Sequence, residues 1–148
     1  MSDTVIRPAT SQDQAAIRSL VLKSNINPTG LDWRRFVVVV IQEGNVIGCG
    51  QIKPHRDGSQ ELASLAVDAE WRGLGVARAI LEHLIASKEG PIYLMCRSSL
   101  GPLYEKFGFE HVDHPQMPKY FQRISRLSSI IEILRKEGQT LLIMKRDS

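Results

Sequence analysis

The sequence predicts a single α/β domain in which a mixed, mostly antiparallel sheet is flanked by helices. Three observations lead to this prediction. The chain has 148 residues, 43% hydrophobic and 24% charged, a balance that lets one domain bury one continuous core. Its first half carries successive β-rich segments separated by tight turns. Its second half alternates short strands with helical periodicity, so we expect one domain over residues 1–148.

Composition and charge exclude several classes of protein. The longest apolar run, Phe36 to Ile41, is far below the roughly 20 residues of a membrane-spanning helix. The N-terminus lacks the pattern of a signal peptide, so we expect a cytoplasmic protein without membrane association. The 19 basic and 16 acidic residues are spread along the chain, and nothing indicates nucleic-acid binding. Cys49 and Cys96 form no redox or ligand pair and are expected to be reduced core residues.

The first half is expected to form a strand, a helix and three antiparallel strands. A short extended segment, Thr4 to Arg7, leads to Ser11 to Gln14, which has the pattern of a capping box for a helix that ends near Ser24. A loop follows, with a short helix around Leu31 to Arg35. Turn residues Gly44 and Asp57-Gly58 then separate three strands. Their ranges are Phe36 to Gln42, Val46 to Pro54 and Glu61 to Val67.

The second half is expected to continue as helices and strands. Apolar residues from Val76 to Ile85 share one helical face, and Gly90-Pro91 ends that helix. A buried strand, a short helix and another strand are then expected at Ile92 to Cys96, Leu100 to Phe107 and Phe109 to Val112. A long amphipathic helix over about Pro118 to Glu137 precedes a final strand, Thr140 to Met144. Such a helix usually covers a sheet, although its basic residues also suit a membrane surface or a partner.

A glycine-rich turn between a strand and a helix is the motif that carries chemistry. The small residues Gly73, Gly75 and Ala77 let an anion approach backbone N–H groups, and the positive end of the helix dipole favours a phosphate there. A dinucleotide-binding loop would need a small residue where Arg78 stands, and a P-loop would need Gly-Lys-Ser/Thr. The motif therefore indicates a pyrophosphate site of another kind.

The segment Arg72-Gly73-Leu74-Gly75-Val76-Ala77 resembles the acyl-CoA signature of the GNAT acetyltransferase superfamily, Arg/Gln-x-x-Gly-x-Gly/Ala. The strand Leu62 to Val67 is similar to the family's fourth strand, and Tyr104 to Phe109 has its Tyr-x-x-x-Gly-Phe pattern. The order of elements also agrees over nearly the whole chain. The long helix before the last strand departs from the family, whose typical members have only a turn there.

The resemblance implies an acetyl-CoA-dependent N-acetyltransferase with a GNAT fold, splayed between the fourth and fifth strands to admit the cofactor. It implies that residues Arg72, Gly73, Leu74, Gly75, Val76 and Ala77 bind the pyrophosphate. It also implies that backbone groups of Leu65, Ala66 and Val67 bind the pantetheine, with one N–H facing the thioester oxygen. Transfer would go directly from thioester to amine in a ternary complex, by a monomer or a homodimer.

Two side chains are candidates for catalysis. Tyr104 is expected to protonate the departing thiolate, because a phenol with a pKa of about 10 suits that step; a packing role is the alternative. Glu61 opens the strand beside the expected acceptor cleft and is the best-placed base for the amine, directly or through water. A solvated residue at a hairpin end is the alternative for Glu61.

The sequence also bears on functions other than catalysis. His111, Asp113 and His114 lack the four cleanly spaced ligands of structural zinc, so we expect surface histidines and no metal. A catalytically weak acyl-CoA-binding sensor or scaffold module is the alternative to catalysis. The amine acceptor stays open between small molecules and proteins, since no charge cluster in the sequence names it.

Overall fold

The structure is a computed structural model and describes residues 3–147. The chain divides into two compact units, Met1–Lys53 with Leu62–Lys88, and Pro54–Glu61 with Glu89–Ser148. Hydrogen bonds join the strands in the order β1-β2-β3-β4-β5-β7-β6. Strand pairs β1–β2, β2–β3, β5–β7 and β6–β7 are antiparallel. The pair β4–β5 is parallel and has Glu61 opposite Tyr93. This is the mixed, mostly antiparallel α/β fold that the sequence predicts.

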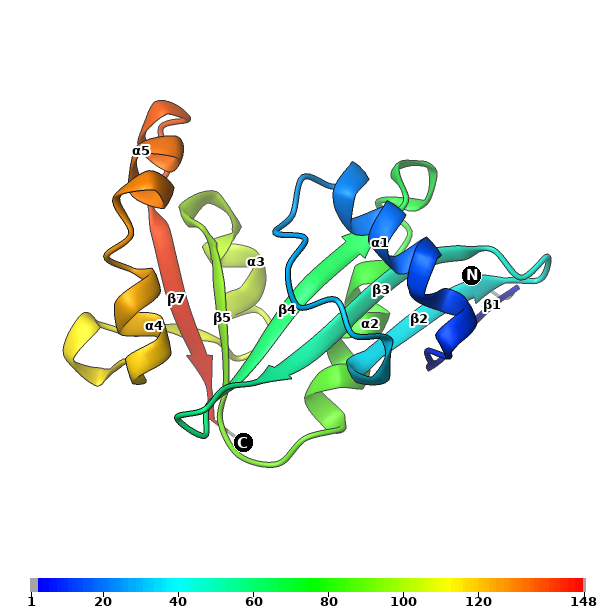
Figure 1. Ribbon diagram of the computed structural model, residues 1–148, viewed down its shortest axis with the longest axis horizontal. Coiled ribbons are helices and arrows are strands. Elements are labelled where there is room, and N and C mark those ends of the chain that lie inside the picture. Colours follow the sequence, from blue (N-terminus) through cyan, green and yellow to red (C-terminus); the bar gives the residue numbers. More distant parts are fainter. Residues whose placement is uncertain (1–2, 148) are drawn as a thin grey trace. The chain divides into compact units, whose positions relative to one another are not determined.

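The first unit is a sheet covered by a helix on each face (Figure 1). Its elements are β1 (Thr4–Pro8), α1 (Gln14–Lys23), β2 (Phe36–Ile41), most of β3 (Val46–Pro54) and of β4 (Gln60–Val67), and α2 (Val76–Ala86). Cys49 packs with Ile17, Leu20 and Val21 of α1, while its neighbours on β3 face α2. Alternate residues of β3 therefore serve the two opposite layers of the core.

Helix α2 lies close to β3 because two strand residues have no side chain. A Cβ added at Gly48 would lie 2.7 Å from Val76 Cγ1, and one at Gly50 would lie 2.8 Å from Ile80 Cγ2. Such distances are shorter than real carbon contacts allow. The glycines at these positions set the distance between helix and sheet.

The second unit is built around β5 (Ile92–Arg97) and β7 (Leu141–Arg146), which pair from Ile92↔Arg146 to Arg97↔Leu141. The other elements are α3 (Gly101–Glu105), β6 (Glu110–His111), α4 (Lys119–Ile124) and α5 (Ser128–Lys136). Tyr93, Val112, Phe121 and Ile143 form its buried cluster, and Leu134 of α5 is also buried. Helices α4 and α5 therefore cover the strands, as expected of the amphipathic segment.

The helix expected over Pro118 to Glu137 is wrong as a single element, because the segment forms two helices. Helix α4 tightens at its end, where the Leu127 N–H bonds to Ile124 O and the Ser125 hydroxyl donates to Gln122 O. Leu127 then adopts an extended conformation with φ −70° and ψ 111° and is 45% exposed. Bonds over three residues and a back-bonding serine end the helix there.

The first helix begins differently from the expected capping box at Ser11 to Gln14. The box is formed by Thr10 and Asp13, and the Thr10 N–H donates to Asp13 Oδ2 over 2.7 Å. A short 3-10 turn, Ser11–Asp13, leads into α1. The side chain of Gln14 instead bridges the loop before β2, donating to Leu31 O and accepting from the Trp33 N–H. Three other expected segments are shorter. The one before β2 is a single 3-10 turn, Trp33–Arg35, the helix expected at Leu100 to Phe107 spans Gly101–Glu105, and β6 spans two residues.

Asp13→Asn is expected to lower the free energy of unfolding by about 1–3 kcal/mol at pH 7. Asp13 is 7% exposed and accepts hydrogen bonds from the terminal Nη1 and Nη2 atoms of Arg7, at 2.8 and 3.2 Å. The hydrogen bond from Arg7 lowers the pKa of Asp13, so its contribution is present above the unfolded pKa and is lost as pH falls through the folded one. Urea unfolding of both proteins at pH 7 and at pH 2.5 measures this. A stability difference that is equally large at both pH values would contradict the prediction.

Candidate functional site

The glycine loop Arg72–Gly75 runs from the end of β4 into α2, as the sequence predicts. Gly73 and Gly75 have φ of 78° and 88°, and a Cβ added at either would meet nothing within 4 Å. Arg72 Nε donates to Val67 O over 3.2 Å and ties the loop to the strand. Gly75 is the residue before the first turn of α2, whose N–H groups point out of the helix. The open space at these two glycines, next to a helix N-terminus, fits a pyrophosphate.

Strand β4 has an irregular backbone just before the residues expected to bind pantetheine. Ser64 has φ 58° although it is buried within the strand, and its hydroxyl accepts from Gln51 Nε2 at 2.9 Å. A left-handed residue interrupts the regular alternation of a strand. Leu65, Ala66 and Val67 follow this interruption, and Ala66 is 3% exposed.

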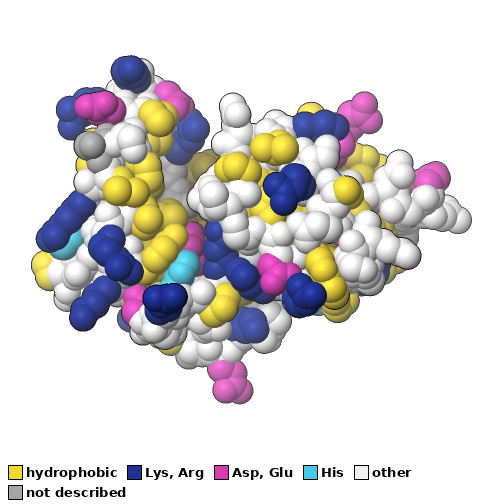
Figure 2. Space-filling model, in the orientation of Figure 1, with side chains coloured by type: hydrophobic (Ala, Val, Ile, Leu, Met, Phe, Trp, Pro, Cys, Tyr) yellow, Lys and Arg dark blue, Asp and Glu magenta, His cyan; other side chains and the backbone are white. Residues whose placement is uncertain are grey.

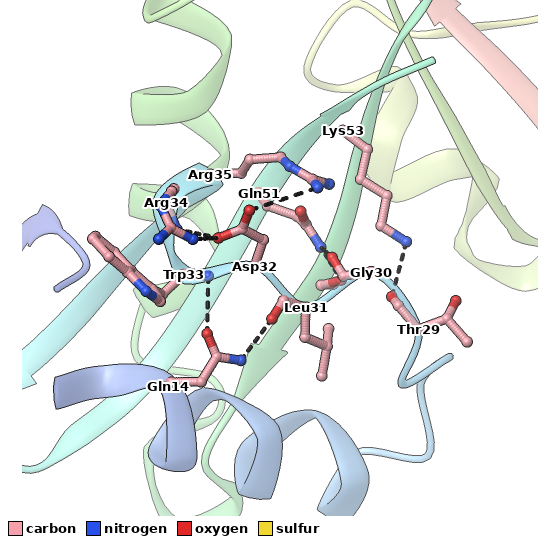
Figure 3. Close-up of polar contacts among 11 residues, drawn as sticks. Gln14, Thr29, Gly30, Leu31, Asp32, Trp33, Arg34, Arg35, Gln51 and Lys53 are labelled. Atoms are coloured by element: carbon pink, nitrogen blue, oxygen red, sulfur yellow. Dashed lines mark hydrogen bonds and ion pairs between the residues drawn. The ribbon is translucent and has the colours of Figure 1, made fainter. Parts of the chain in front are cut away.

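The loop before β2 is fastened to β3 by polar contacts (Figure 3). Gln51 Nε2 donates to Gly30 O at 3.1 Å, and Lys53 Nζ donates to Thr29 O at 3.2 Å. Asp32 pairs with Arg34 at 3.2 Å and with Arg35 at 3.9 Å. The structure thus places Lys53, Arg34 and Arg35 around one loop.

Glu61 lies in the second unit and is not the solvated hairpin residue of the alternative interpretation. It is 4% exposed, and its Oε1 atom is 2.8 Å from His55 Nε2. The His55 ring stacks on Tyr120 of α4, with centroids 3.6 Å apart and planes inclined by 15°. The Tyr120 N–H donates to Asp57 Oδ2 in the turn between β3 and β4. A buried carboxylate, an imidazole and a phenol ring are therefore held together.

His55 and Tyr120 are functional candidates that sequence reasoning missed. The turn after β3 pairs the His55 N–H with Ser59 O, so the register of this hairpin could have pointed from His55 toward Glu61. Tyr120 carries no such signal, because it lies far along the chain, on helix α4.

Tyr104 is partly buried on α3, where its ring meets Phe109 edge to face at 6.1 Å. Two causes raise the pKa of the Tyr104 phenol to about 12: burial, which is the larger, and the Coulombic effect of nearby Cys96. The phenol therefore keeps its proton at neutral pH and can donate it.

Both cysteines are free and buried, as predicted. Burial raises the pKa of Cys49 to about 12 and that of Cys96 to about 11. Neither thiol forms an appreciable amount of the nucleophilic thiolate at neutral pH.

On the face drawn in Figure 2, the second unit has a hydrophobic band over α4, α5 and β7, with Lys and Arg side chains beside it. Leu127 and Ile133 are exposed by 45% and 58%. His111 is exposed as expected, but His114 is only half-exposed and its Nε2 atom is buried without a partner. Within residues 3–147, no three His, Cys, Asp or Glu side chains come close enough to hold a metal ion, and no helix is long and apolar enough to cross a membrane.

The predicted residues therefore fall into two groups. Leu65, Ala66 and Val67 belong to the first unit, where Val67 O bonds to Arg72 of the glycine loop, whereas Glu61 and Tyr104 belong to the second. Strand β4 is continuous between the groups, since it runs from Gln60 to Val67.

Relatives of known sequence include N-acetyltransferases. Human N-acetylaspartate synthetase is 31% identical over 91 residues, which cover 54% of this chain and 30% of that protein. An uncharacterised N-acetyltransferase of Chlorobaculum tepidum is 25% identical over 133 residues, which cover 82% of this chain and 85% of the relative. The chain thus spans less than a third of the length of the synthetase.

Solved structures with the same fold include two that contain coenzyme A. One is N-acetylglutamate synthase of Neisseria gonorrhoeae with CoA and N-acetylglutamate, with a TM-score of 0.73 and 20% identity over 97% of this chain and 35% of the other. The other is Rv2747 of Mycobacterium tuberculosis with CoA and the ligand NLQ, with a TM-score of 0.72 and 22% identity over 97% of this chain and 99% of the other. The model of the acetyltransferase (GNAT) domain matches residues 33–111, more than half of the sequence, and the chain belongs to the GNAT acetyltransferase family.

Proposed function

We propose that this chain, acting as one domain, is an acetyl-CoA-dependent N-acetyltransferase that transfers the acetyl group directly to an amine in a ternary complex. The glycine loop at the N-terminus of α2 carries the proposal. Gly73 and Gly75 leave the backbone open at the positive end of an 11-residue helix, where a pyrophosphate gains hydrogen bonds and a favourable dipole. The CoA-bound structures with the same fold support the choice of cofactor.

The cofactor supplies an acetyl thioester, and residues of this chain bind and orient it. Arg72 to Ala77 hold the pyrophosphate, and backbone groups of Leu65, Ala66 and Val67 hold the pantetheine. A backbone N–H aimed at the thioester oxygen typically contributes about a hundred- to a thousand-fold in rate. The left-handed conformation of Ser64 supports this role, because it turns the backbone of β4 out of its regular alternation immediately before these residues.

Two side chains move protons. Glu61 assists the loss of a proton from the amine, directly or through water, and Tyr104 donates a proton to the sulfur as the carbon–sulfur bond breaks. The buried thiols support direct transfer over an acyl-cysteine intermediate, since a pKa of about 11 or 12 keeps Cys96 and Cys49 protonated.

The acceptor is a small amine that also carries a carboxylate, as an amino acid does. Arg34, Arg35 and Lys53 surround the loop before β2, and such cations pair with carboxylates. N-acetylaspartate synthetase is similar in sequence, and N-acetylglutamate synthase has the same fold. Both proteins are named for acetylated amino acids, which supports this class of acceptor.

A CoA-release assay with a panel of amines tests the proposal. Acidic and neutral amino acids, their carboxamides, polyamines and peptides are each added to the protein with acetyl-CoA, and the acetylated product is identified by mass spectrometry. Release that depends on an amino acid and falls with its carboxamide supports the proposal. Tight CoA binding without release dependent on any amine would support the sensor module instead.

Glu61→Gln is expected to lower kcat/KM by about a hundred- to ten-thousand-fold and to move or remove the acidic limb of the pH–rate profile. Glutamine keeps the size of the side chain and removes the charge, so packing beside Tyr93 should survive. Stopped assays between pH 5 and pH 10 measure the profile. An unaltered profile would remove Glu61 from the mechanism.

A further inference from the structure

The carboxylate of Glu61 is poorly placed to meet an amine alone. Its side chain is 5% exposed, and one of its oxygens already faces an imidazole nitrogen, since Oε1 lies 2.8 Å from His55 Nε2. The His55 side chain is 12% exposed, so it is the more accessible member of the pair.

The contact also determines how the imidazole carries its proton. An ionised carboxylate only accepts hydrogen bonds, so a bond of 2.8 Å to Glu61 requires hydrogen on Nε2. In the neutral ring the lone pair is then on Nδ1.

We propose that His55 is the general base and that Glu61 is its positioning residue, with Nε2–H donating to Glu61 and Nδ1 taking the proton of the amine. The inference deepens the proposed function and rests on it for the identity of the reaction. It replaces a lone carboxylate by a pair in which the carboxylate orients the imidazole and balances its charge.

The inserted helix α4 completes this pair. The Tyr120 ring lies parallel to the His55 ring at 3.6 Å, and Phe121 meets it edge-on at 5.8 Å. Asp57 fixes α4 to the hairpin, because its Oδ2 accepts from the Tyr120 N–H while its Oδ1 accepts from Ser59. The imidazole is therefore held by a strand, a turn and a helix, which is the support that a catalytic ring needs.

Two carboxylates and an aromatic ring surround His55. Glu61 faces it from β4 and Asp57 from the turn, and the aromatic face of Tyr120 attracts positive charge. Burial acts to raise the pKa of Asp57, but hydrogen bonds from Ser59 and from Tyr120 outweigh it and hold the value at about 2. Burial and the charge of Glu61 raise the pKa of Tyr120, with Arg123 opposing them, so this phenol stays neutral.

The proton balance is complete with these groups. An ammonium substrate gives one proton to Nδ1, and the free amine forms the new nitrogen–carbon bond as the carbon–sulfur bond breaks. A second N–H proton leaves the nitrogen as the amide forms. One of the two ends on sulfur and the other in solvent, which regenerates the neutral imidazole.

The pH dependence of kcat/KM separates the pair from a lone carboxylate. For His55→Gln, whose amide can still donate to Glu61, we expect a loss of about a hundred- to ten-thousand-fold and no acidic limb. For Glu61→Gln the limb should remain and move to lower pH, because the imidazolium loses its carboxylate. The matched control is His83→Gln, a change of the exposed histidine on α2, with an unaltered profile. An acidic limb that is unchanged in His55→Gln and absent in Glu61→Gln would overturn the proposal.

Nitrogen NMR of the wild-type protein tests the pair without turnover. Proton–nitrogen correlation spectra of the imidazole should show the neutral His55 as the Nε2–H tautomer. The Nδ1–H tautomer would overturn the proposal even if no variant folds. Absence of amine-dependent CoA release from the wild type would instead contradict the proposed function, whatever the tautomer.

Two substitutions at Tyr120 measure the contribution of the inserted helix. Tyr120→Phe keeps the ring on His55 and should leave kcat within about twofold, whereas Tyr120→Ala frees the imidazole and should lower kcat by about 10- to 100-fold. Equal rates in the two variants, with unchanged acetyl-CoA binding, would contradict a positioning role for α4.

Discussion

Gly75→Glu is expected to weaken acetyl-CoA binding by at least about 100-fold, or about 3 kcal/mol, in a protein that still folds. The new carboxylate would lie at the N-terminus of α2, in the space proposed for the pyrophosphate, and would repel it there. A Cβ at Gly75 meets no atom within 4 Å, so no part of the fold has to move. The left-handed φ of 88° still costs the variant about 1–2 kcal/mol of stability.

Gly44→Glu is the matched control for this substitution. Gly44 lies in the turn between β2 and β3, has φ 91° and also has open space around its Cβ position. The two variants share the added charge and the backbone strain, and only one lies at the glycine loop. Isothermal titration with acetyl-CoA should therefore show normal affinity for Gly44→Glu and an affinity at least about 100-fold weaker for Gly75→Glu. Equal affinities would refute the assignment of the loop.

Tyr104→Phe is expected to lower the maximal rate by about a hundred- to ten-thousand-fold, because the departing thiolate loses its proton donor. The ring and its contact with Phe109 remain, so acetyl-CoA affinity should hardly change. The comparison is made at saturating acetyl-CoA and amine. Equal maximal rates would leave Tyr104 as a packing residue, and a parallel loss of cofactor binding would mean that it positions CoA.

The raised pKa of Tyr104 adds a second measurement to the same pair of proteins. A phenol with a pKa of about 12 in the folded state and 10.0 as its ordinary value binds its proton more tightly when folded. Stability therefore falls as pH rises from about 10 to about 12, and the variant should lack this part of the fall. Neither protein should lose activity through this group below pH 10.

The strands and the glycine loop could be predicted to within one or two residues because local chemistry specifies them. The turn at Gly44 marks the start of β3, and the change of periodicity at Gly75 marks the start of α2. Both signals lie within a few residues of the elements that they predict. The break after α4 could not be predicted, since the apolar spacing continues through Ser125 to Leu127 and only the bonding of the last turn ends the helix.

The candidate site was predictable only where it is local in sequence. Glu61 could be selected from its place at the start of a strand, and the cofactor loop from its motif. The pair of Glu61 with His55 depends on hairpin register. The stacking of Tyr120 on His55 is accompanied by a hydrogen bond from the Tyr120 N–H to Asp57, which lies 63 residues earlier in the chain. No periodicity within a helix or strand reports contacts of that kind.

The two glycines beneath α2 have a consequence for experiments that map residues by their effect on function. A side chain at Gly48 or Gly50 would overlap Val76 or Ile80, and we expect it to displace the helix whose first turn follows the glycine loop. Substitutions there should raise KM for acetyl-CoA, as cofactor-binding mutations do. Both glycines, however, lie on β3 beneath α2 and outside the glycine loop. A saturation screen would then identify Gly48 and Gly50 as positions that affect acetyl-CoA binding, although we expect neither to contact the cofactor. The substitutions would act by changing the spacing between α2 and β3.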